Sequence, residues 1–97
     1  MTTTDHRKNA EGHVQTLTAV VQTLPASPER DALVAECTAL AVAIRAFHME
    51  GIRFRMFNVD RILSRTELPL TPDAGAAFTQ ARESLEAAGF HTRSHQA

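Results

Sequence analysis

The sequence predicts an all-α fold of three helices in which the central helix is long. Two observations indicate this class. Apolar residues recur at alternating steps of three and four, which places them on one face of a helix. Residues 27–29 (Ser-Pro-Glu) and 71–73 (Thr-Pro-Asp) are helix-start combinations, because the hydroxyl residue can cap the helix and proline suits its first turn.

The first predicted helix ends at a proline. Its apolar stripe consists of Ala10, Val14, Leu17, Val21 and Leu24. Pro25 disfavours helical backbone at the residue before it, so the helix is expected to stop there. The polar ends of the chain, residues 1–8 and 91–97, are expected to be frayed. We expect the whole chain, 1–97, to be a single helical domain.

The central helix is expected to begin after Ser27 and to continue past Gly51. Its first apolar stripe is Leu33, Cys37, Leu40, Ile44 and Phe47, and its second is Ile52, Met56, Val59 and Leu63. The second stripe lies about a quarter-turn around the helix axis from the first. One long helix that presents different faces to different neighbours explains this shift. The alternative is a kink near Gly51 that divides the segment into two helices.

The second half of that long helix is apolar over most of its circumference, so it must be surrounded. Two flanking helices of the same chain can hardly surround it. A small chain of 97 residues also gains from oligomerisation, since it buries little surface by itself. We therefore predict an intermolecular helical bundle, formed as a homodimer or larger even oligomer, in which the long helices pair.

The third predicted helix has clear signals at both ends. It begins at Thr71, and its stripe is Ala74, Phe78, Ala81, Leu85 and Ala88. Gly89 can adopt the left-handed backbone that terminates a helix. Phe90 can then pack back on Leu85.

Composition limits the classes of function. The ten basic and eleven acidic residues give a net charge of -1, which excludes a global attraction to nucleic acid or to an acidic membrane. A single cysteine excludes an intramolecular disulfide. The polar N-terminus and the absence of a long apolar run argue against a secretory signal and a membrane span, so we expect a cytoplasmic protein with no membrane partner.

A basic segment with interleaved phenylalanines is the most distinctive feature. It runs from Arg45 to Arg65, and the residues expected to bind a partner are Arg45, Arg53, Phe54, Arg55, Phe57 and Arg61. Arginine and aromatic side chains are common in binding hot spots. One interpretation is contact with nucleic acid phosphates, and another is contact with an acidic protein. A third is structural: the arginines extend from a crowded core and pair with Glu36, Glu67 or Glu83.

No signature of an enzyme, metal site or cofactor site is present. Cys37 lies within an apolar stripe, where a thiol is buried and inert. His91 and His95 are four residues apart but follow the Gly89 helix stop, and the ligand spacing of structural zinc is missing. His48 lies between the two stripes of the central helix and could face a ligand pocket.

These observations predict a small non-enzymatic interaction or regulatory module that acts as a homo-oligomer and binds a protein partner. One alternative is a DNA- or RNA-binding regulator that uses the basic segment. Another is a helical bundle that binds a small molecule or metal near His48. No cofactor is expected.

Overall fold

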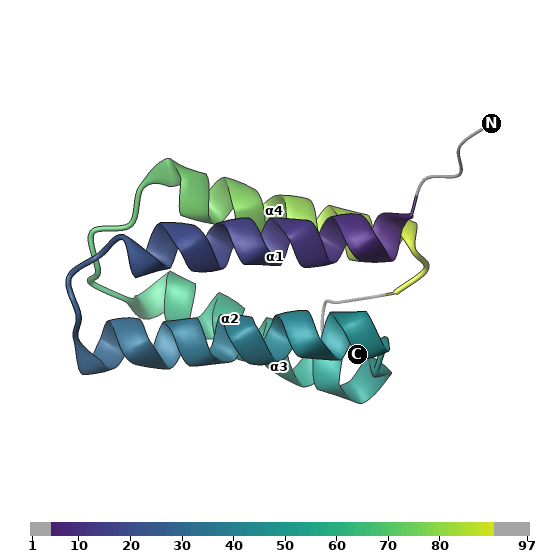
Figure 1. The fold of residues 1–97 in the computed structure, drawn as a ribbon, viewed down its shortest axis with the longest axis horizontal. Helices are drawn as coiled ribbons and strands as arrows, with labels where there is room; N and C mark the ends of the chain where they lie inside the picture. The colour runs from purple at the N-terminus through teal and green to yellow at the C-terminus, as the bar shows by residue number, and fades with distance from the viewer. Residues whose placement is uncertain (1–4, 91–97) are drawn as a thin grey trace.

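The computed structural model describes residues 5–90, and these form four α-helices and no strand. The helices are α1 (His6–Gln22), α2 (Pro28–Ala46), α3 (Met49–Arg65) and α4 (Pro72–Ala87). Short connections join them, so consecutive helices run in opposite directions as an up-down-up-down bundle (Figure 1). The all-α prediction is confirmed, and the three-helix prediction is wrong. Residues 6–8, expected to be frayed, belong to α1, whereas residues 1–4 and 91–97 lie outside the described residues.

The expected long central helix is divided at Phe47 and His48. Phe47 adopts left-handed backbone (φ 50°, ψ 45°). Its N–H donates to the Ile44 carbonyl at 2.9 Å, and the N–H of His48 donates to the Ala43 carbonyl at 2.9 Å. This pair of bonds is the Schellman motif, which satisfies the last carbonyls of a helix. The chain therefore reverses here instead of continuing.

His48 also begins the next helix. Its Nδ1 accepts a hydrogen bond from the backbone N–H of Gly51 at 2.9 Å, as an N-cap side chain does. A Cβ at position 51 would lie 2.8 Å from that Nδ1, so glycine leaves room for the capping imidazole. The alternative prediction, a kink near Gly51 that divides the segment into two helices, is close to the observed break, which falls three residues earlier at His48.

The other helix ends largely follow the sequence signals. Ser27 caps α2 by accepting from the Arg30 N–H at 3.0 Å. Thr71 occupies the N-cap position of α4, but its side chain makes no capping bond. At the far end of α4, Gly89 has φ 93°, and the N–H of Phe90 donates to the Leu85 carbonyl at 2.9 Å. This is a second Schellman motif, and Phe90 is fully buried as its hydrophobic contact.

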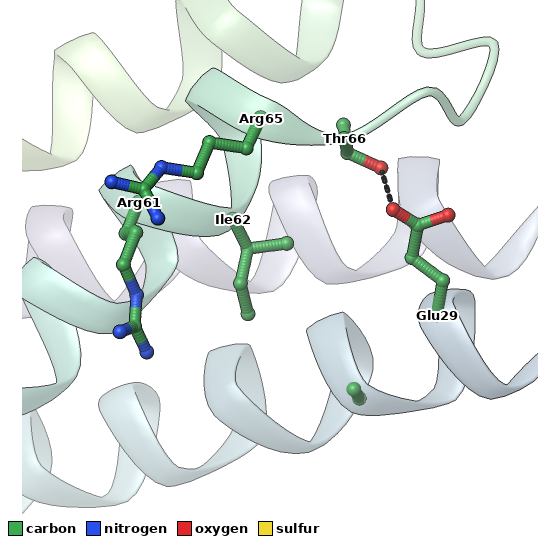
Figure 2. Close-up of a pocket in the computed structure, with 6 residues that line it drawn as sticks. Glu29, Arg61, Ile62, Arg65 and Thr66 are labelled. Carbon is green, nitrogen blue, oxygen red and sulfur yellow. Dashed lines mark hydrogen bonds between the residues drawn. The ribbon is translucent and has the colours of Figure 1, made fainter.

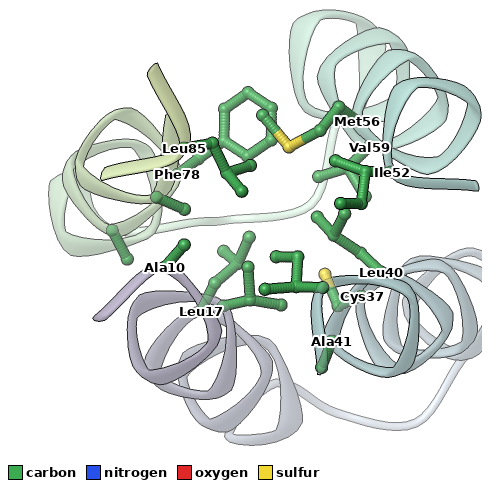
Figure 3. Close-up of a cluster of buried hydrophobic side chains, with 14 of the residues drawn as sticks. Ala10, Leu17, Cys37, Leu40, Ala41, Ile52, Met56, Val59, Phe78 and Leu85 are labelled. Carbon is green, nitrogen blue, oxygen red and sulfur yellow. The ribbon is translucent and has the colours of Figure 1, made fainter. Parts of the chain in front are cut away.

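One apolar core lies at the centre of the four helices. Figure 3 shows labelled side chains from all four directed towards it. The core consists of Ala10, Val14, Leu17, Val21, Leu33, Cys37, Leu40, Ala41, Ile44, Ile52, Met56, Val59, Ala74, Ala77, Phe78, Ala81, Leu85 and Phe90. The four predicted stripes supply most of these residues, while Leu24, Phe47, Leu63 and Ala88 are only partly buried.

The reversal after α2 explains the shift between the two stripes of the expected long helix. Because α3 runs back along α2, its stripe of Ile52, Met56 and Val59 enters the same core as that of α2. The apolar side of α3 is thus covered within one chain. The need to cover that side therefore no longer supports a second copy, and the homodimer stays a prediction.

The helices approach one another unequally. Helix α1 lies closest to α4 and α2, and α3 lies against α2. Small side chains at Ala10, Ala74, Ala77 and Ala81 allow the close approach of α1 and α4. No helix in the described part of the chain is long and apolar enough to cross a membrane.

Candidate functional site: the outer face of helix α3

The side of α3 that faces away from the core carries two exposed aromatic rings. Phe54 and Phe57 are each 57% exposed, more than any other large apolar side chain among the described residues. Glu50, Arg53 and Arg61 are exposed on the same side. We call these five residues the outer face of α3. Large apolar side chains grouped at the surface often mark a binding site.

The arginines of the outer face form no ion pair with any residue between 5 and 90. The guanidinium of Arg53 lies over the ring of Phe90, 5.3 Å from its centroid, and that of Arg61 lies over the ring of Phe57 at 5.6 Å. Such contacts leave the guanidinium N–H groups available to carboxylates. The outer face therefore combines apolar area with donors that have no anionic partner among residues 5–90.

Two of the predicted partner-binding arginines are instead paired within the chain. Arg45 Nη2 lies 2.7 Å from Glu11 Oε2 and joins α2 to α1. Arg55 Nη1 donates to both carboxylate oxygens of Glu36, at 3.0 and 3.2 Å, and joins α3 to α2. Asn58 donates to the same carboxylate at 3.2 Å. The structural interpretation of the basic segment is therefore confirmed for Arg55 and Glu36.

A further ion pair links α3 to α4. Asp60 Oδ1 lies 3.6 Å from Arg82 Nη2. The guanidinium of Arg82 also lies over the ring of Phe78, 4.8 Å from its centroid. This pair engages the second acidic residue of α3, so Glu50 is the one acidic side chain of α3 that forms no ion pair within residues 5–90.

A shallow hollow adjoins the outer face between the start of α2 and the end of α3 (Figure 2). Its volume is about 310 Å³, and its lining residues are Glu29, Ala32, Arg61, Ile62, Arg65 and Thr66. Thr66 Oγ1 donates to Glu29 Oε2 at 2.8 Å, and so ties the two helix ends together. Arg61 and Arg65 are one turn apart on its α3 side. A second open hollow of about 310 Å³ lies between α1 and α2, around Thr18 and Arg45.

His48, the predicted ligand residue, is an exposed helix cap that lines neither hollow. Its Nδ1 is occupied by the Gly51 N–H, so its observed role is structural. One feature of the sequence indicates that His48 begins a helix. Gly51, three residues later, has no side chain and so leaves space for the imidazole ring.

Cys37 is fully buried, as predicted. Burial raises the pKa of its thiol from 9.0 to about 12, the nearby Glu36 carboxylate adds to the rise, and a hydrogen bond with Thr18 opposes it. A thiol with such a pKa is protonated and unreactive at neutral pH. No group of three histidine, cysteine, aspartate or glutamate side chains in the part described could hold a metal ion. His91 and His95 lie outside the described residues.

These features define a single-chain, up-down-up-down four-helix bundle with an arginine- and phenylalanine-bearing surface on one helix. No family model, curated protein or solved structure matches the chain.

Proposed function

We propose that the protein is a non-enzymatic interaction module that binds a protein chain through the outer face of α3. The observation that carries the proposal is the exposure of Phe54 and Phe57 beside Arg53 and Arg61, which lack carboxylate partners within residues 5–90. Fully burying one phenylalanine contributes about 1.5–3 kcal/mol, so two half-exposed rings supply a useful fraction of a binding energy. A cytoplasmic location and a regulatory role are part of this proposal.

The distribution of charge favours a protein over a nucleic acid as the partner. The carboxylates of Glu11 and Glu36 already neutralise Arg45 and Arg55. Glu50 stands among the remaining arginines and would repel phosphates. Exposed phenylalanines contribute to nucleic acid binding when bases stack on them, and that outcome is tested below through its salt dependence.

A ligand site near His48 has weaker support. The imidazole Nδ1 is used to cap α3, and the side chain is exposed to solvent rather than directed into either described hollow. A small-molecule site normally encloses most of its ligand. We therefore do not extend the proposal to a ligand or a metal.

Site-specific photocrosslinking tests the proposal. A benzophenone amino acid is placed at position 54, and the matched control carries it at position 42, because Val42 is 54% exposed but lies on α2. We expect position 54 to crosslink to a protein, which mass spectrometry identifies, and position 42 to give little product. The additional change Phe57→Ser should remove the product.

Two outcomes would contradict the proposal. Equal yields at positions 42 and 54, or none at 54, would mean that the outer face is not a protein-binding surface. Crosslinking to nucleic acid, with a yield that falls steeply as salt is added, would favour the DNA- or RNA-binding alternative instead.

A further inference from the structure

We infer that the protein bound by the outer face of α3 is a second copy of this chain, held antiparallel about a twofold axis that passes between positions 55 and 56. This inference rests on the proposed function and names its partner. It differs from the pairing predicted from the sequence, because the residues in contact lie on the solvent side of α3 and the core of each copy stays intact.

The outer face is complementary to itself. Glu50, Phe54, Phe57 and Arg61 follow one another at steps of four, three and four, which keeps all four on one side of the helix. Positions 54 and 57 are equidistant from the midpoint of this set. Positions 50 and 61 are also equidistant from it, and each of these two lies about 8 Å from the midpoint along the helix axis. A twofold interface requires such a pattern, because each residue meets its counterpart across the axis.

Antiparallel pairing in this register places unlike charges together. Phe54 meets Phe57 of the partner subunit at the centre, and Glu50 meets Arg61 of the partner subunit at the rim, each contact occurring twice. An apolar centre with a charged rim is the usual arrangement of a protein interface. The aromatic contacts supply most of the affinity, and the rim charges select the register.

Other arrangements bring like charges together. Parallel helices would align Glu50 with Glu50 and Arg61 with Arg61. An antiparallel pair centred on Phe57 would place Arg53 opposite Arg61. Like charges directly opposite oppose association, so the register centred between positions 55 and 56 is preferred.

Two other charged side chains of α3 form ion pairs within the chain. Asp60 pairs with Arg82, and Arg55 pairs with Glu36. Arg53 lies over the ring of Phe90. Glu50 and Arg61 form no ion pair with any described residue. The register thus joins Glu50, the one acidic side chain of α3 without an ion pair among residues 5–90, to Arg61, one of the α3 arginines that also lack an ion pair there.

Charge exchange tests the register. Sedimentation velocity of the purified full chain, from micromolar to millimolar concentration, measures self-association. Glu50→Arg and Arg61→Glu should each weaken the dimer about tenfold or more, because each change puts two like-charged pairs at the rim. The double variant E50R/R61E restores opposite charges at both positions and should regain the dimer. An equimolar mixture of the two single variants should form heterodimers in preference to either homodimer.

A measurement of helix content and two further variants separate an effect on the dimer from an effect on folding. Glu50 lies in the first turn of α3, where a negative charge stabilises the helix, so far-ultraviolet circular dichroism accompanies each sample. Phe57→Ser changes an exposed side chain, should leave the fold intact and should abolish the dimer. Val42→Ser, on α2, should leave the dimer unchanged.

A wild-type chain that is monomeric at every concentration would overturn the inference, as would single charge reversals that leave a dimer unaffected or a double variant that fails to regain it. The proposed function has a separate test. If the pure chain is monomeric but position 54 crosslinks to a different protein, the second copy is the wrong partner and the interaction surface stands. If position 54 crosslinks to nothing, both fail.

Discussion

Replacing Gly51 with alanine should fail to stabilise the protein, although the same change in an open helical position stabilises it. Alanine is favoured over glycine within a helix by about 1 kcal/mol. At position 51, however, the new Cβ would lie 2.8 Å from His48 Nδ1 and 3.4 Å from Ala43 Cβ. The imidazole must move away, and the loss of an N-cap bond costs about 1 kcal/mol. We expect the two terms to cancel, which gives a net change near zero or slightly unfavourable.

Gly12→Ala in α1 is the matched control, since nothing lies within 4 Å of a Cβ built there. It should stabilise the fold by about 1 kcal/mol. Urea unfolding followed by far-ultraviolet circular dichroism provides the measurement, because the chain lacks tryptophan and tyrosine for optical probes. His48→Ala alone should destabilise the protein by about 1 kcal/mol through loss of the cap.

The pair of substitutions identifies the cause. In the His48→Ala background no imidazole obstructs position 51, so Gly51→Ala should recover most of its stabilisation, apart from the close contact with Ala43. The coupling free energy between the two sites is then about 1 kcal/mol. If Gly51→Ala stabilises the wild-type chain as much as Gly12→Ala does, or if its effect is the same with and without His48, then His48 does not cap α3.

Two other predictions concern Cys37 and Glu36. The thiol of Cys37, whose pKa is raised from 9.0 to about 12, should resist alkylation at neutral pH unless the protein unfolds. Because the unfolded thiol ionises first, the free energy of unfolding should fall as pH rises from 9 towards 12, and Cys37→Ala should flatten this slope. Glu36→Ala should destabilise the fold by about 1–2 kcal/mol in urea unfolding, since it leaves Arg55 and Asn58 without their shared acceptor. The control Glu83→Gln, on the exposed side of α4, should change the free energy of unfolding by less than about 0.5 kcal/mol. If Glu36→Ala lowers the free energy of unfolding no more than Glu83→Gln does, the contacts of Glu36 do not stabilise the bundle.

The helical segments and their inward faces follow from the spacing of apolar residues. Stripes such as Val14, Leu17 and Val21 are buried as their periodicity indicates, because a helix can hide only one side against its neighbours. The cap at Gly89 with Phe90 was also predictable, since glycine adopts left-handed backbone without a steric penalty. These features depend on residues within a few turns of one another.

The division of the central segment was less accessible to sequence reasoning. Phe47 takes the left-handed conformation that glycine usually takes at a helix end, so its residue type gives no signal for a stop. The quarter-turn shift between the two stripes did indicate a change of direction. A long helix with two sets of neighbours also explains that shift, but the structure produces it by reversing the chain at His48.

The sequence by itself determined which segments are helical, which of their sides are apolar and that Cys37 is buried, because local spacing and chemistry fix these properties. Only the tertiary structure decided which arginines of the basic segment pair with an acidic residue. Glu11 is 34 residues from Arg45, and Glu36 is 19 residues from Arg55, so these pairs exist only once α1, α2 and α3 lie side by side. The same packing covers the apolar side of α3 and leaves Phe54 and Phe57 in solvent. Contacts between distant segments depend on where the chain reverses direction. The reversal at Phe47, which its residue type does not indicate, decides which side of α3 faces solvent.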